Sequence, residues 1–412
     1  MFASAGNRAN AMLSAASFRK LLFSRSFSSS SRTSETLNPL PATFLRGGTS
    51  KGIFINRDHL PSDRSAWDRI FLGIMGSPDP VHGRQLNGMG GGVSSLSKIC
   101  VVGTPSLAQQ SQGIQVEYTF VQVGIRDTSI DYSGNCGNLS SIIGAYALDE
   151  GICCDPTTTL DGSRITIRSF NTNTQKIIDT TFPVSNALVP VLDLPETSIA
   201  GVPGDASQIV MDFVNPGGAR TGKLLPTDHP IDSLTSPNVS VSLVDATNPT
   251  VFIRADELSS FLPLSDYLKH IPTEVPQVLE SIRQRGAVKM GLDPLAQAQP
   301  KIAILSAPNT SDDHAQSVDI VVHALSMGVL HKAVPMTVGL CLGVAANIPG
   351  TIAWDIVSES RQNRQSGDSK LVRIRHPSGT VDVGAELSPD GHVKSAKVVR
   401  TGRRLMKGVV WW

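Results

Sequence analysis

Short apolar runs punctuated by glycine, proline and small polar residues characterise the chain from Asn38 onward. Runs of about four to eight residues rich in Val, Ile and Phe, bounded by turn residues, are typical of strands. Two such runs flank a Gly/Ser turn within residues 42–56, and the run at 116–123 alternates between apolar and polar positions. The pattern predicts further strands over residues 99–102, 164–167, 208–213, 239–243, 251–254, 301–305, 371–375, 379–383 and 396–400.

Apolar residues spaced three and four positions apart predict a smaller number of helices. Residues 138–150 place Leu139, Ile142 and Tyr146 on one face, and Gly151 supplies a C-terminal stop. Helices are also predicted over residues 58–75, 275–285, 318–325 and 337–347. This mixture of strands and helices indicates an α/β protein. The stretch 226–237, rich in Pro, Asp, Ser and Thr, is the best candidate for a domain boundary.

The two halves of the chain share an order of parts. Ser50 precedes an apolar strand, and Cys136 follows 86 positions later beside a small-residue helix. Asn248 precedes a similar strand, and Cys341 follows 93 positions later, again beside a small-residue helix. The agreement predicts a duplicated domain with a cleft between the copies, with chance similarity as the alternative.

Length and charge narrow the classes of function. The chain has 412 residues, of which 40% are hydrophobic, and this is enough for about two to three packed domains. The net charge of +1 offers no basic footprint for nucleic acid or an anionic membrane, and no run has the length of a membrane-spanning helix. A small molecule is therefore the expected partner, and assembly into a homodimer is left open.

The cysteines and histidines do not form a recognisable framework. Five Cys and nine His are scattered without CxxC pairs or His/Cys groups at ligand spacing. The sequence therefore predicts no structural metal, no catalytic metal and no disulfide scaffold, which suits a reducing compartment.

The first 34 residues differ from the rest of the chain. They contain five basic residues and ten serines, and no acidic residue occurs before Glu35. An Arg- and Ser-rich, acid-free, amphipathic start is the signature of a mitochondrial transit segment. Residues 1–34 are therefore predicted to be such a segment. The alternative is a disordered tail without an address, in which case the protein is cytoplasmic.

Three glycine-rich segments do not satisfy the known phosphate-binding motifs. The segment 88–92 lacks the third glycine of the dinucleotide fingerprint, because Val93 occupies that position. The segment 217–223 matches GxxxxGK, but Leu224 follows where a magnesium-binding Ser or Thr is required. The segment 47–51 has neither spacing. These segments are interpreted as turns, or as backbone N–H groups that line another kind of anion pocket.

Two residues carry candidate chemistry. Cys136 lies between Gly/Asn pairs immediately before a predicted helix, where the helix start stabilises a thiolate and can bind a carboxylate. The alternative is a small buried cysteine in a turn. Lys98 enters an apolar strand, so its amine must either reach water or lose its proton readily. The alternative is a lysine on an edge strand.

The ordered motifs 46–54, 88–98, 133–138, 221–227 and 248–252 resemble the PrpF family of 2-methylaconitate cis–trans isomerases. That family also includes methylitaconate Δ-isomerase, aconitate Δ-isomerase and 4-oxalomesaconate tautomerase. The resemblance covers about residues 40–408. It implies the diaminopimelate epimerase-like fold, in which two similar α/β domains, each a curled mixed sheet around a central helix, hold the active site between them. We accordingly expect domains at 38–230 and 231–408, with the last strands returning to the first domain. Asn87 departs from the Asp expected before Gly88 in many members.

The resemblance also implies roles for particular residues. Lys98 and Cys136 match the active-site lysine and cysteine, and the implied isomerase needs no cofactor. We interpret Lys98 as the base. Cys136 either returns or shuttles the proton, or only lines the pocket. The preferred substrates are aconitate and 2-methylaconitate. The expected substrate-binding residues are Ser50, Ser133, Gly137, Asn138 and Thr337.

Two alternative functions remain at this stage. An amino-acid racemase or epimerase would use Cys136 and Cys341 as paired bases, although Cys341 lacks the CGSG surroundings of the related epimerases. A non-catalytic carboxylate-binding protein of the same fold would bind ligand without exchanging protons.

Overall fold

Strands outnumber helices in the structure, as the short apolar runs predict. The computed structural model describes residues 37–132, 134–153, 157–158, 162–296, 299–308, 318–326, 328–362 and 371–412. Leu37–Trp412 forms one compact unit. The predicted transit segment, residues 1–34, lies outside the described residues. Among those that are described, no helix has the length and hydropathy to span a membrane.

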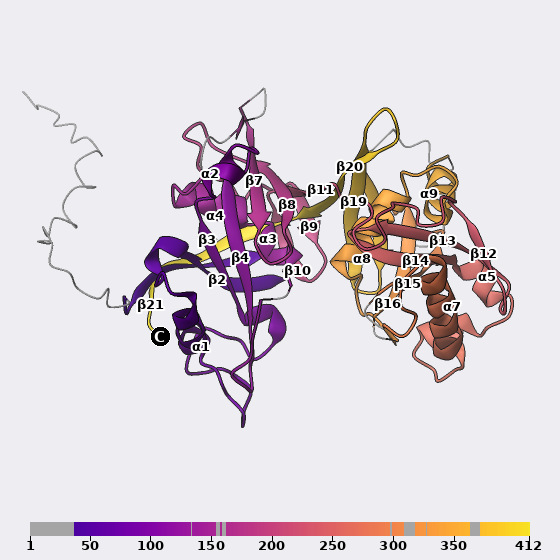
Figure 1. Ribbon diagram of the computed structural model, residues 1–412, viewed down its shortest axis with the longest axis horizontal. Coiled ribbons are helices and arrows are strands. Elements are labelled where there is room, and N and C mark those ends of the chain that lie inside the picture. Colours follow the sequence, from indigo (N-terminus) through magenta and orange to yellow (C-terminus); the bar gives the residue numbers. More distant parts are fainter. Residues whose placement is uncertain are drawn as a thin grey trace, which may run out of the picture. The chain divides into compact units, whose positions relative to one another are not determined.

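The first half of the unit is a mixed sheet wrapped around a central helical segment (Figure 1). Its strands are β1 (Leu40–Gly47), β2 (Ser50–Asn56), β3 (Lys98–Gly103), β4 (Val116–Val123), β5 (Ile130–Asp131), β6 (Thr157–Thr158), β7 (Arg164–Asn171), β8 (Lys176–Pro183), β9 (Thr197–Ile199), β10 (Val202–Ala206) and β11 (Ile209–Val214). Its helices are α1 (Trp67–Met75), α2 (Leu107–Gln110), α3 (Gly137–Ser140) and α4 (Ile143–Asp149). Leu139, Ile142 and Tyr146 are buried where α3 and α4 contact the sheet.

The second half is built in the same way around α8 (Met336–Ala345), which contacts β13, β14 and β18 to β20. Its strands are β12 (Asp232–Leu234), β13 (Val239–Ala246), β14 (Asn248–Arg254), β15 (Lys301–Ser306), β16 (Ile320–Ser326), β17 (Val329–Leu330), β18 (Leu371–His376), β19 (Gly379–Leu387), β20 (Val393–Arg400) and β21 (Gly402–Val410). Its other helices are α5 (Ala255–Ser259), α6 (Leu264–Leu268), α7 (Val275–Lys289) and α9 (Ile352–Gln362).

Strand pairing shows that the two halves are repeats. In the first half, the pairs β1–β2, β2–β3, β3–β4, β4–β7 and β7–β8 run antiparallel, parallel, antiparallel, parallel and antiparallel. The pairs β13–β14, β14–β15, β15–β16, β16–β18 and β18–β19 follow the same order of directions. The short strands β5 and β17 add antiparallel to β4 and β16. The fold class implied by the resemblance is therefore confirmed, and the internal similarity reflects a duplicated topology.

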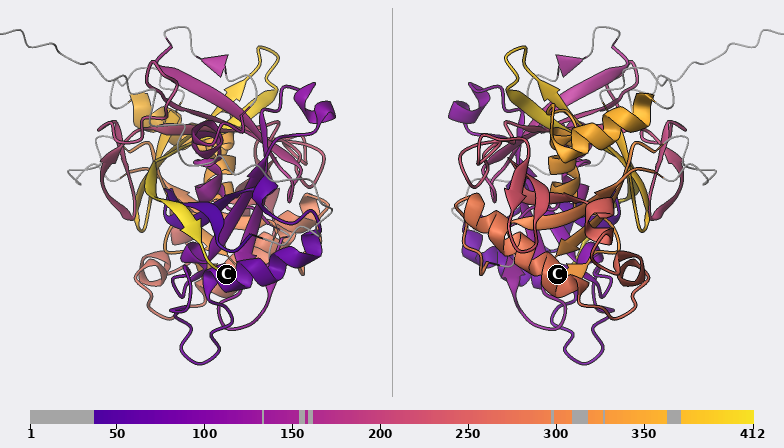
Figure 2. Two further views of the ribbon diagram at one scale, coloured as in Figure 1. Left: turned by 90° about the vertical axis from the view of Figure 1, so that its left-hand side faces the viewer. Right: turned by 90° about the vertical axis from the view of Figure 1, so that its right-hand side faces the viewer.

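The end of the chain joins the two halves. Strand β20 pairs with β19 and with β11, and β21 pairs antiparallel along the whole of β1. Figure 2 shows the yellow C-terminal strand beside the indigo strand that begins the unit. The domain limits 38–230 and 231–408 stay a prediction.

Two helix predictions need correction. Residues 318–325, predicted to be helical, form strand β16. A short apolar run is ambiguous by periodicity alone, and here pairing with β15 and β18 and the β-branched Ile320, Val321 and Val322 favour the strand. The helix predicted over 58–75 begins only at Trp67, after two short 3-10 turns.

The predicted helix 138–150 is broken into α3 and α4. The Ser140 hydroxyl donates to the Cys136 carbonyl, and the Ser141 hydroxyl donates to the Asn138 carbonyl. Such side-chain bonds compete with the helical backbone ladder. The break lies directly after the residues of the candidate site.

Candidate active site

Cys136 lies at the start of α3 and contacts a residue of the first hairpin. Its thiol donates to the Ser50 hydroxyl over 3.7 Å, and Ser50 is buried at the first position of β2. Asn138, two positions later, donates through Nδ2 to the Thr49 hydroxyl over 3.0 Å. The turn between β1 and β2 approaches α3 so closely that a Cβ on Gly48 would lie 2.3 Å from Asn138 Oδ1. The glycines of this turn therefore allow Ser50, Cys136 and Asn138 to meet.

Asn135 is held in place from the strand side. The Tyr118 hydroxyl on β4 lies 3.3 Å from Asn135 Oδ1 and 2.7 Å from the Ser140 hydroxyl. Ser140 also donates to Asn135 Oδ1 over 3.1 Å. Burial raises the pKa of the fully buried Tyr118 phenol, so that this phenol remains a hydrogen-bonding group. These bonds orient the polypeptide on the N-terminal side of Cys136.

Lys98 is the first residue of β3, and its side chain is almost fully buried. Its Nζ donates to Gln122 Oε1 on β4 over 2.6 Å and lies 5.0 Å from the centre of the Phe120 ring. Gln122 in turn donates to the Ser97 carbonyl, which fixes its amide. Lys98 and Cys136 make no hydrogen bond with each other. Cys100, on the same strand face as Lys98, is close enough to both to interact with them electrostatically.

A cavity of about 540 Å³ opens beside this group. Asn135 and Gly137 line it on one side, and Met336 and Thr337, at the start of α8, line it on the other. Its walls combine apolar side chains with amides and hydroxyls, and their two charged residues, Lys176 and Arg220, are both cationic. The remaining lining residues are Asn173, Thr174, Ile177, Ile178, Phe213, Val214, Asn215, Pro216, Ala219, Thr247 and Gln299. A cavity with cations and without acids among its lining residues is suited to an anionic ligand.

The two helix starts are in direct contact. A Cβ on Gly137 would lie 2.2 Å from Met336 Sδ, so only glycine fits while Met336 keeps its position. The Thr247 hydroxyl donates to the Thr337 carbonyl over 2.9 Å. This bond is the repeat counterpart of the one between Thr49 and Asn138, because both link a hairpin turn to the start of a central helix.

Arg400, at the end of β20, also contacts this group and was not predicted from the sequence. Its Nε donates to Asn138 Oδ1 over 3.2 Å, and its Nη1 donates to the Val399 carbonyl. Burial lowers its pKa to about 10, although the nearby Cys136 acts in the opposite direction, so the guanidinium remains charged at neutral pH. Arg400 also contributes, after burial, to lowering the pKa of His376 to about 4, and that imidazole is neutral. An arginine ending an apolar run was the only sequence signal for this residue.

The predicted site residues are thus brought together to different degrees. Gly137 and Thr337 line the cavity, and Ser50, Cys136 and Asn138 form a connected group beside it. Lys98 adjoins this group through Cys100, whereas Ser133 lies outside the described residues. Within the described ranges, no three His, Cys, Asp or Glu side chains gather closely enough to hold a metal ion.

Comparison with known proteins identifies the family. The family model described as "PrpF protein" matches residues 38–412. The chain belongs to the PrpF family. It is 35% identical over 390 residues to the 3-methylitaconate isomerase of Eubacterium barkeri, covering 90% of this chain and 97% of that one. It is 34% identical over 401 residues to the 2-methyl-aconitate isomerase of Shewanella oneidensis, covering 90% and 96%.

The crystal structure of a methylitaconate-delta-isomerase has the same fold as this PrpF-family chain. The TM-score is 0.79 at 33% identity, over 92% of this chain and 96% of that one. This structural similarity supports the diaminopimelate epimerase-like architecture. Because the relatives are isomerases, the PrpF-family protein is identified as an isomerase.

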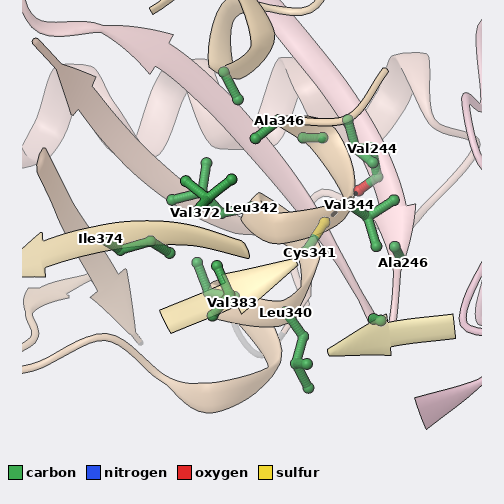
Figure 3. Close-up of a cluster of buried hydrophobic side chains, with 14 of the residues drawn as sticks. Val244, Ala246, Leu340, Cys341, Leu342, Val344, Ala346, Val372, Ile374 and Val383 are labelled. Atoms are coloured by element: carbon green, nitrogen blue, oxygen red, sulfur yellow. Dashed lines mark hydrogen bonds between the residues drawn. The ribbon is translucent and has the colours of Figure 1, made fainter. Parts of the chain in front are cut away.

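The repeat also shows which residue of this PrpF-family protein is equivalent to Cys136. Cys136 precedes α3 and lies six residues after the start of β5, and Pro335 precedes α8 and lies six residues after the start of β17. The equivalent of Cys136 is therefore Pro335, and not Cys341 as the sequence spacing suggested. Cys341 lies within α8 and is fully buried among aliphatic side chains (Figure 3). Its burial raises the thiol pKa to about 12.

Proposed function

We propose that this protein isomerises unsaturated di- or tricarboxylates by removing and returning a carbon-bound proton, with aconitate and 2-methylaconitate as the preferred substrates. The observation that carries the proposal is the cavity beside Cys136, whose charged lining residues, Lys176 and Arg220, are both cationic. The apolar part of its lining, which includes Phe213 and Met336, is suited to an alkene or a methyl group.

The chemistry balances without an oxidant or a reductant. A CH₂ proton next to a carbon–carbon double bond and within reach of a conjugated carboxylate is weakly acidic. Its removal leaves the electron pair in a dienolate, where the former double bond has mixed order and can rotate. Return of the proton to the same carbon gives the cis–trans isomer, and return to the other end of the system moves the double bond.

Lys98 is assigned as the base in this proposal. A neutral amine can donate one hydrogen to Gln122 and keep its lone pair for the substrate. The ammonium formed after proton transfer would then face the Phe120 ring, whose π-electrons attract a cation. Lys98 is not among the residues that line the cavity, and it adjoins the Cys136 group through Cys100.

Cys136 is assigned to proton return, and the surrounding donors are assigned to the carboxylates. The Cys136 thiol is only partly buried and has Ser50 as its neighbour. Ser50 contacts the Cys136 thiol, Asn138 lies two positions after Cys136, and the charged Arg400 contacts Asn138. Fixed donors of this kind stabilise the negative charge that grows on a carboxylate as the dienolate forms.

Proton NMR in D₂O tests the proposal. Purified protein would be incubated with cis-aconitate, then with 2-methylaconitate and with methylitaconate. The expected result is an isomer that carries deuterium at the reacting carbon, because the abstracted proton exchanges with the solvent. The absence of both isomer and deuterium with all three compounds, and with 4-oxalomesaconate, would overturn the enzymatic proposal in favour of a carboxylate-binding protein.

Lys98→Ala is the matched control. It is expected to abolish isomer formation and deuterium uptake, while the circular dichroism spectrum and the binding of aconitate by calorimetry are retained. Turnover in Lys98→Ala equal to that of the unmodified protein would remove Lys98 from the chemistry and leave the reaction class standing.

A further inference from the structure

The loop between β11 and β12 forms one wall of the cavity. Its residues Pro216, Ala219 and Arg220 line the space. The loop closes tightly on itself, with the Gly222 N–H donating to the Gly218 carbonyl. A Cβ on Gly218, which has a φ of +68°, would lie 2.6 Å from the carbonyl carbon of Gly222. The glycines of this segment, which resembled a phosphate loop in sequence, serve this turn.

A buried carboxylate holds the loop in place. Asp245 on β13 is fully buried, and its Oδ2 accepts from the Arg220 N–H over 2.8 Å, the Thr221 N–H over 2.7 Å and the Thr221 hydroxyl over 2.9 Å. The Asp245 backbone accepts from the Gly218 N–H and donates to the Leu224 carbonyl. A buried carboxylate is stable only when hydrogen-bonded, so the fold requires this loop conformation. The position of the Arg220 backbone is therefore set by the body of the second half.

The charge on Arg220 has no internal partner. In the described part of the chain, its guanidinium makes no ion pair and no side-chain hydrogen bond. The neighbouring cation of the same loop, Lys223, is instead paired with Asp228 at 2.7 Å. Arg220 is thus the unpaired cation of the loop and lines the cavity, whereas Lys223 is paired with Asp228 and does not line it.

We propose that Arg220 binds a carboxylate of the substrate and that this contact favours tricarboxylates over dicarboxylates. The inference rests on the proposed function, whose substrate class it refines. A guanidinium offers parallel N–H donors that match both oxygens of one carboxylate. Lys176, the cavity's other cation, lies on β8, so the two cations approach the space from different elements. Two carboxylates can then be bound in the cavity while a third is held beside Cys136.

Steady-state kinetics on Arg220→Ala tests the assignment, with Lys223→Ala as the control. Both variants remove one positive charge from the same loop, but only Arg220 lines the cavity. For cis-aconitate, Arg220→Ala is expected to raise KM about 10- to 100-fold, the range of a charge-assisted bidentate contact, with a smaller change in kcat. For the dicarboxylate methylitaconate, the expected rise in KM is less than about threefold. Arg220→Lys is expected to recover part of the loss.

The positioning residue Asp245 is tested in the same series. Asp245→Asn should raise KM for cis-aconitate through the loop, but should add little when Arg220 is already alanine. If Asp245 had a purely structural role, Asp245→Asn would impair turnover of both cis-aconitate and methylitaconate, and its effect would add to that of Arg220→Ala. Equal KM for Arg220→Ala and the unmodified protein, or an equal loss in Lys223→Ala, would overturn the inference.

Calorimetry with tricarballylate, a saturated tricarboxylate, separates this inference from the proposed function. If the unmodified protein turns over no substrate but binds tricarballylate, and Arg220→Ala weakens that binding while Lys223→Ala does not, the proposed function fails and the Arg220 assignment stands. If turnover is present but binding is insensitive to Arg220, the assignment fails and the proposed function stands.

Discussion

Replacing Cys341 by alanine should lower stability slightly and leave turnover unchanged. The side chain is fully buried in α8, and its thiol donates to the Val244 carbonyl over 3.5 Å. Removing one buried heavy atom of about methylene size corresponds to about 1 kcal/mol of unfolding free energy. In a chain of this length, we expect the melting temperature to fall by about 2 °C or less.

The loss should also depend on pH in a defined direction. Burial raises the Cys341 pKa from 9.0 to about 12, so between these values the thiol ionises in the unfolded chain and stays neutral in the folded one. The stability contributed by the neutral thiol is complete below pH 9 and falls as the pH rises towards 12. At pH 10 the fall is about 1 kcal/mol, which is enough to cancel the advantage of cysteine over alanine at neutral pH.

Urea unfolding at pH 7 and pH 10, together with kcat for cis-aconitate, measures both effects. The expected result is a Cys341→Ala variant less stable at pH 7, equal in stability at pH 10, and within about twofold of the unmodified kcat at pH 7, well below the usual contribution of an acid–base group. Loss of turnover comparable to that of a catalytic residue would contradict a structural role for Cys341 and favour the alternative in which Cys136 and Cys341 act as paired bases.

Three further variants test other parts of the structure. Cys136→Ser should lower kcat at least about tenfold if the thiol moves protons, and a change within about twofold would leave it a lining residue. Gln122→Glu places a carboxylate against Lys98 Nζ, where it can pair with the amine and oppose proton removal by it, so kcat should fall; an unchanged kcat would contradict a lysine base. Gly402→Ala would place a Cβ 2.4 Å from Ile142 Cδ1 and should destabilise the fold by about 1–3 kcal/mol in urea unfolding, and unchanged stability would show that Ile142 is free to move.

Local pattern predicted the parts of this fold that depend on neighbouring residues. The apolar runs at β4 and β14 and the small-residue helix α8 were located correctly because alternation and helical spacing are properties of the chain itself. The helix prediction for residues 318–325 was wrong because a buried apolar run of this length suits a helix or a strand equally. Pairing with β15 and β18 decides in favour of the strand. The β21 strand was not predicted, because its exposed, basic residues follow β1 rather than an apolar period.

The order of residues alone indicates the chemical character of the region around Cys136: a thiol in a Gly/Asn turn before a helix, and a lysine at the start of an apolar strand. The groups that surround these two residues depend on the tertiary structure. Ser50 meets Cys136 across 86 positions, Arg400 meets Asn138 across 262, and Asp245 directs Arg220 towards the cavity. It also placed Cys341 in a core and Pro335 at the position equivalent to Cys136. Periodicity states which residues share a face, whereas the partner of that face depends on strand pairings between distant segments that no local pattern encodes.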